Sequence, residues 1–194
     1  MSEVRDYKSE QLKRRVRNSH KLGRRAWFSK TLALLAPPAL AAGYSRYEST
    51  WLEVTQTRLA LSDLPKGRKI KILHLSDLHL SQTVSAEDID QAFEEGLKGS
   101  PHACMITGDF ITDQPSAEKL QSLGNCLSKY SAKLPIFACL GNHDGGSWAA
   151  DHGGFPTSEK VSLMLQQSRV RLLHNQRVSV MLNRTPITLI GVGD

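Results

Sequence analysis

Three short polar blocks, each placed directly after an apolar run, constrain this chain most. The blocks are Ser76-Asp77-Leu78-His79, Gly108-Asp109 and Gly141-Asn142-His143-Asp144. The runs before them, residues 70–75, 103–107 and 135–140, are short and apolar enough to predict strands buried on both faces. Because ligands of open α/β sheets bind beyond the carboxyl ends of the strands, we expect the three blocks to share one edge of one sheet.

Helical patterns between these runs complete an α/β order. Apolar residues fall on one face of residues 85–97, 116–130 and 158–167, which predicts three amphipathic helices. Strands that alternate with helices build a layered α/β sheet with right-handed crossovers. Further short strands are predicted near residues 171–173, 178–182 and 187–192, with some antiparallel or mixed pairing, and the alternation in residues 51–61 predicts one or two edge strands.

The first two blocks offer metal ligands. Asp77 and His79 are two residues apart at the end of a strand, so a bend there can turn an oxygen and a nitrogen toward one cation. Such a mixed set suits manganese, iron or zinc better than calcium. Asp109 follows Gly108, where the backbone can turn tightly, and its two carboxylate oxygens can bridge two cations.

The third block adds a neutral ligand and a proton carrier. Asn142 offers a carbonyl oxygen without a charge that would repel a phosphate, and His143 is a candidate cation or general acid whose tautomer Asp144 could hold. His152, in the following loop, is either a surface residue or a substrate contact. Asp-x-His or Gly-Asp alone is more often a structural turn, but three such clusters at one sheet edge are hard to explain as solvated turns.

Taken together, the three blocks resemble the first three signature blocks of the calcineurin-like metallophosphoesterases, and the resemblance extends over residues 69–194. It implies a layered sandwich with a parallel or mixed central sheet. It also implies a hydrolase that acts on a phosphomonoester, phosphodiester or pyrophosphate bond and depends on two divalent metal ions. By this resemblance Asp77 and His79 would bind the first metal, Asp109 would bridge both, and Asn142 would bind the second. A hydroxide held between the metals would attack phosphorus.

The resemblance gives His143 and Asp144 catalytic roles as well. His143 would protonate the leaving oxygen or steady the phosphate, and Asp144 would orient it. Family members carry two further blocks downstream, a His near a strand end and a Gly-His-x-His, which complete the two metal sites. The sequence reaches residue 194 without them. We therefore expect a truncated and impaired enzyme that lacks the C-terminal half of its domain, with a non-catalytic binding or regulatory remnant as the alternative.

The charge of the chain is concentrated in its first 30 residues. They hold ten Lys/Arg against three Asp/Glu, whereas the remainder is nearly neutral, so a nucleic-acid partner is not expected for the domain. The apolar residues 31–43 follow this basic stretch, and Arg24-Arg25 resembles a twin-arginine export signal. Residues 1–45 are therefore predicted to be an export signal or an uncleaved membrane anchor, ahead of a phosphoesterase domain at residues 46–194. A basic arm that binds nucleic acid is the minor alternative.

This N-terminal segment and the phrase Gly141–Trp148 most resemble those of the membrane-associated or exported bacterial branch of the family. That branch includes enzymes similar to UDP-2,3-diacylglucosamine pyrophosphatases. We accordingly expect a phosphorylated small-molecule or lipid substrate, and a location at the membrane or elsewhere in the cell envelope.

Overall fold

A computed structural model describes residues 52–61, 64 and 67–193. The expected signal or anchor at residues 1–45 lies outside these residues. The account below concerns the described residues of the unit Val54–Asp194. Within the described part of the chain, no helix has the length and apolar character that crossing a membrane requires.

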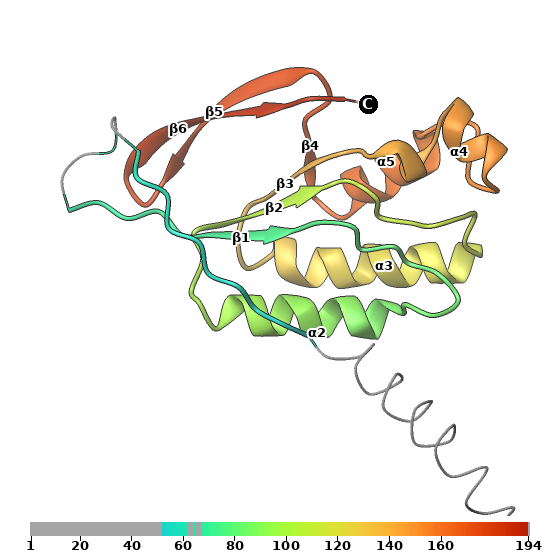
Figure 1. Cartoon of the computed structure of the whole chain (residues 1–194), viewed down its shortest axis with the longest axis horizontal. Coiled ribbons are helices and arrows are strands. Elements are labelled where there is room, and N and C mark those ends of the chain that lie inside the picture. The colour runs from blue at the N-terminus through green and yellow to red at the C-terminus, as the bar shows by residue number, and fades with distance from the viewer. Residues whose placement is uncertain (1–51, 62–63, 65–66, 194) are drawn as a thin grey trace, which may run out of the picture. The chain divides into compact units, whose positions relative to one another are not determined.

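A parallel sheet forms the centre of the domain, in the order β1-β2-β3-β4. Its strands are β1 (Ile72–Leu75), β2 (Ala103–Thr107), β3 (Ile136–Cys139) and β4 (Arg171–Leu172). The helices α2 (Ala86–Leu97), α3 (Ala117–Ser131) and α5 (Glu159–Gln167) lie between them in the sequence, and Figure 1 shows α2 and α3 side by side along one side of the sheet. The predicted layered α/β fold is confirmed.

The two longer helices begin where their capping residues predict. Ser85 forms a capping box with Asp88 at the start of α2: its Oγ accepts from the Asp88 amide at 3.3 Å, and its own amide donates to Asp88 Oδ2 at 2.8 Å. Ser116 caps α3 in a similar way through the amide of Lys119. Both helices start in the segments that follow the carboxyl ends of β1 and β2, where the first two polar blocks lie.

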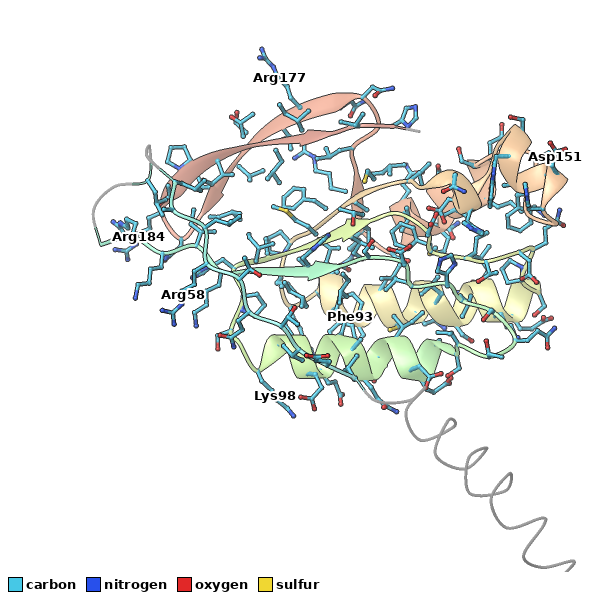
Figure 2. The ribbon with its side chains drawn as sticks, in the orientation of Figure 1. Arg58, Phe93, Lys98, Asp151, Arg177 and Arg184 are labelled. Carbon is cyan, nitrogen blue, oxygen red and sulfur yellow. The ribbon has the colours of Figure 1, made fainter. Side chains whose placement is uncertain are left out.

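The main core lies between the helices and the sheet. Phe93 of α2, labelled in Figure 2, stacks on Tyr130 of α3 with ring centroids 4.3 Å apart, and both side chains are fully buried. The other main contributors come from β2, β3 and α5: Cys104, Ile106, Ile136, Ala138, Val161 and Leu165. Burial of this apolar surface fixes the sheet against the helices, and so fixes the strand ends that carry the site.

A separate antiparallel hairpin covers part of the other sheet face. It consists of β5 (Gln176–Leu182) and β6 (Thr185–Gly191), and Leu182 packs with Ala103, Phe137 and Leu173 in a second small core. The sequence predicted strands with some antiparallel pairing in this region, and β5 and β6 do pair antiparallel. They form a two-stranded sheet of their own and do not extend the central sheet.

Two expectations about strands are wrong. β1 was predicted to be buried on both faces, but Ile72 is 37% exposed and His74 is exposed, because β1 is an edge strand and the hairpin core contacts this face near the amino ends of the strands. Residues 52–61, the described part of the expected edge strands, form neither helix nor strand. Their apolar alternation is not matched by a partner strand, and Leu59 is 81% exposed.

Candidate active site

The first two polar blocks continue side by side beyond the sheet edge. The amide of Asp77 donates to the Gly108 carbonyl at 3.3 Å, and the amide of His79 donates to the Asp109 carbonyl at 2.9 Å. A parallel bridge between Leu80 and Ile111 follows. The backbone therefore holds these two blocks in register without help from their functional side chains.

Three of the expected metal ligands have left-handed backbone conformations. The φ angles are 54° for Asp77, 47° for His79 and 54° for Asp109. A positive φ is uncommon for residues other than glycine and concentrates at functional sites, where surrounding structure holds it in place. Here these conformations supply the bend that the sequence predicted at the end of β1.

Gly108 joins the second block to the third. Its φ is 83°, and a Cβ atom at this position would lie 2.5 Å from the amide nitrogen of Gly141, closer than real contacts allow. Only glycine combines this conformation with this close approach. The loops that follow β2 and β3 can therefore touch, which brings Asp109 next to the Asn142–Asp144 turn.

Carboxylate oxygens from two blocks surround the ring of His79. Its Nε2 lies 3.6 Å from Asp77 Oδ1 and 3.8 Å from Asp109 Oδ2. The hydroxyl of Thr112 donates to the His79 carbonyl at 3.3 Å and lies 3.2 Å from Nδ1. The Thr112 hydroxyl therefore contacts the Nδ1 side of the ring, and Nε2 faces the two carboxylates.

This arrangement suits a cation between the groups. Two carboxylates this close to each other repel, so a cation bound among these groups is electrostatically favourable. With bonds of about 2.1 Å, atoms up to about 4.2 Å apart can ligate the same ion. The distances of 3.6 and 3.8 Å lie inside this limit. His79, Asp109 and His143 form a cluster whose ligand atoms are all within 4.8 Å of one another and could hold a metal ion.

Asp109 is fixed by the turn that contains the third block. This turn is the 3-10 helix η1 (Asn142–Asp144). The amide of His143 donates to Asp109 Oδ1 at 3.1 Å, while Oδ2 faces His79. One oxygen of Asp109 is therefore held by the turn, and the other is directed toward the ring of His79. Asn142 opens the same turn and is half-buried.

The ring of His143 is held by Thr112 and not by Asp144. Its Nδ1 lies 2.9 Å from the Thr112 carbonyl, which can only accept, so Nδ1 carries a proton and Nε2 is the free ring nitrogen. The expectation that Asp144 holds the tautomer of His143 is therefore corrected, because the backbone carbonyl of Thr112 holds the ring through Nδ1.

Asp144 instead connects the loops that follow β2 and β3. It is fully buried, and its carboxylate accepts from the amides of Asp109, Phe110 and Gly141 at 2.7–2.9 Å. Burial raises the pKa of this carboxyl to about 6, although the backbone amides act in the opposite direction. Its role in the described structure is to shape the backbone around Asp109 and His143.

Sequence reasoning missed two residues next to the site. Thr112 contacts both histidines, and Trp148 of the short helix α4 (Ser147–Asp151) lies with its ring centroid 4.5 Å from that of His143. Thr112 belongs to none of the polar blocks, and Trp148 ends the phrase Gly141–Trp148 without a predicted role of its own. The position of Thr112 three residues after Asp109, in the loop that continues β2, was the only signal available.

Residues 70–188 match the family described as calcineurin-like phosphoesterase. The chain belongs to this family of metal-dependent hydrolases. The match spans all three polar blocks and agrees with the parallel sheet and with the His79, Asp109 and His143 cluster.

Similar curated proteins come from several bacteria. The chain is 28% identical over 174 residues to the phosphodiesterase YaeI of Escherichia coli, which covers 89% of this chain and 61% of that protein. It is 31% identical to the metallophosphoesterase YkuE of Bacillus subtilis, over 74% of this chain and 50% of that protein. It is 34% identical to the UDP-2,3-diacylglucosamine pyrophosphatase LpxG of Chlamydia muridarum, over 67% of this chain and 40% of that protein. The chain thus spans about half the length of the curated relatives it matches.

Proposed function

We propose that this chain hydrolyses a phosphate ester or pyrophosphate bond with two divalent metal ions, manganese, iron or zinc. Asp77 and His79 would hold one ion, Asn142 the other, and Asp109 both. The strongest support is the arrangement around His79, whose Nε2 lies 3.6 and 3.8 Å from carboxylate oxygens of Asp77 and Asp109. When bound, such ions neutralise charge on the phosphoryl oxygens and acidify a water molecule.

His143 is the residue we propose to handle the proton of the leaving group. The Thr112 carbonyl occupies its Nδ1, so only Nε2 can give a proton to a leaving oxygen or contact a phosphoryl oxygen. The same turn donates its backbone amide to Asp109, so the acid and the bridging carboxylate keep a fixed spacing. Asp144 contributes by positioning both loops, and we do not assign it a step of its own.

Removal of metal tests this proposal. We expect dialysis against EDTA to abolish hydrolysis of bis(p-nitrophenyl) phosphate and p-nitrophenyl phosphate, because the clustered carboxylates, without metal, repel a phosphate instead of binding it. Manganese, iron or zinc, added separately, should restore the initial rate, and mass spectrometry should find the restoring metal in the protein. Well-folded protein that binds no metal and hydrolyses neither ester would contradict the proposal and favour a non-catalytic binding or regulatory module.

The pyrophosphate bond of a UDP-linked lipid is the second candidate substrate. It is favoured by the 34% identity over 138 residues to the Chlamydia muridarum UDP-2,3-diacylglucosamine pyrophosphatase. Incubation of the metal-loaded chain with UDP-2,3-diacylglucosamine should then release UMP. Turnover of the chromogenic esters without release of UMP would reject this substrate and leave the general phosphoesterase proposal standing.

We further propose that residues 1–45 direct the chain to the membrane or to another part of the cell envelope. The supporting observation is the order of a strongly basic stretch followed by the apolar residues 31–43. Fractionation of cells that express the whole chain would test this, and recovery entirely with the cytosolic fraction would contradict it.

A further inference from the structure

Trp148 is a large aromatic side chain that remains 41% exposed beside the proposed acid. Its ring centroid lies 4.5 Å from that of His143, and the His143 centroid lies 4.8 Å from that of His79. The three rings therefore form a continuous row that runs from the candidate metal ligands toward the surface. A substrate whose phosphoryl group binds at those ligands would therefore have the exposed indole of Trp148 near it.

The loop that carries Trp148 is fastened on both sides. Gly145 has a φ of 142°, and a Cβ atom there would lie 2.4 Å from the backbone of Thr157. Only glycine can therefore occupy this position of the loop. The next turn is closed by the Gly154 amide, which donates to the Ala149 carbonyl at 2.7 Å. Gln114, five residues after Asp109, donates its side-chain amide to the Gly154 carbonyl at 2.8 Å. The loop is thereby tied to the one that holds Asp109.

His152 supports the indole from one side. The two rings are stacked with centroids 4.0 Å apart and an interplanar angle of 14°, and His152 Nδ1 lies 2.7 Å from the Trp148 carbonyl. One indole face is therefore occupied and the ring is held in place. A ring that is already ordered loses little conformational entropy when a ligand stacks on its remaining surface.

We propose that Trp148 is a substrate-binding residue that stacks on an aromatic ring of the substrate, the chemical class to which nucleobases belong. The inference rests on the proposed function, because a phosphoryl group at the candidate metal ligands is what brings such a ring within reach of the indole. Stacking on tryptophan is tolerant of the identity of the base, because every base has a flat π-face. Trp148 would thus select substrates with an aromatic group near the phosphate, without contacting phosphorus.

A matched pair of ligands tests this inference. Uridine 5′-monophosphate and ribose 5-phosphate share the sugar and the phosphate, and only the first carries a base. We expect calorimetric titration of the manganese-loaded chain to show uridine 5′-monophosphate binding about tenfold more tightly. Trp148→Ala should remove this preference and leave the affinity for ribose 5-phosphate within about twofold, whereas Trp148→Phe should keep most of it. Leu163→Ala is the control, because it removes an exposed apolar side chain from another element, α5. It should change neither affinity.

A fluorescence measurement keeps the test independent of the alanine variant. The sequence has three tryptophans, so Trp148 is the sole fluorescent indole once Trp27 and Trp51 are changed to phenylalanine. Uridine 5′-monophosphate should quench this signal and ribose 5-phosphate should not. Equal affinities for the two ligands, or an equal loss of both in Trp148→Ala, would overturn this inference alone. Failure of both ligands to bind would overturn the proposed function and this inference with it.

Discussion

Replacement of Asp109 by asparagine is expected to lower kcat/KM for bis(p-nitrophenyl) phosphate by about a hundredfold or more. Loss of a residue that only supports a metal ligand costs a metal enzyme up to about a hundredfold, and loss of a direct ligand should cost no less. Asparagine has nearly the same shape and can still accept the His143 amide bond that Asp109 Oδ1 accepts at 3.1 Å. It lacks the negative charge and the second oxygen that faces His79. The change therefore removes the proposed bridge between the two metals and leaves the loop as it is.

Asp113→Asn is the matched control for this variant. Asp113 lies in the same loop, is exposed, and undergoes the same loss of one charge. We expect its kcat/KM to stay within about twofold of the original chain. Metal content should separate the two variants as well, since Asp109→Asn should bind less manganese at equal free metal and Asp113→Asn should not. An Asp109→Asn protein with full activity would show that the reaction does not use this carboxylate.

The parts of the site that could be predicted from the sequence are those encoded locally. Apolar runs that end in polar residues gave the strand ends, and parallel strands place their carboxyl ends at one edge, so the proximity of Asp77, His79 and Asp109 followed. Serine caps predicted the starts of α2 and α3 for the same reason, because a cap depends on residues only three positions away.

The parts that could not be predicted depend on contacts between loops. Asp144 lies next to His143 in the sequence, but the turn of η1 directs its carboxylate toward the amides of two loops. Thr112 reaches both histidines through its hydroxyl and its carbonyl, and no spacing rule selects it. The exposed face of β1 follows from its position at the edge of the sheet. An apolar run in the sequence does not indicate whether its strand will be central or at an edge.

Asp144→Ala is expected to lower the free energy of unfolding by about 3 kcal/mol, with the largest stability effect of any single change at the site. The carboxylate accepts the amides of Asp109, Phe110 and Gly141, and its side chain is fully buried. Alanine leaves these three donors without their acceptor, and each unsatisfied buried donor costs about 1 kcal/mol or more. Asp144→Asn should cost about half as much, because its carbonyl can keep the two amides that Oδ2 accepts while its NH2 group meets the third donor.

Urea denaturation followed by circular dichroism measures this loss as a shift of the midpoint at unchanged slope. Asp151→Ala, which truncates the exposed aspartate labelled on α4 in Figure 2, should stay within about 0.5 kcal/mol of the original chain. An Asp144→Ala protein of unchanged stability would mean that water satisfies the three amides. The pair Asp109→Asn and Asp144→Ala thus separates two kinds of carboxylate in one site: the first is expected to change activity without stability, and the second acts through the backbone that holds the first.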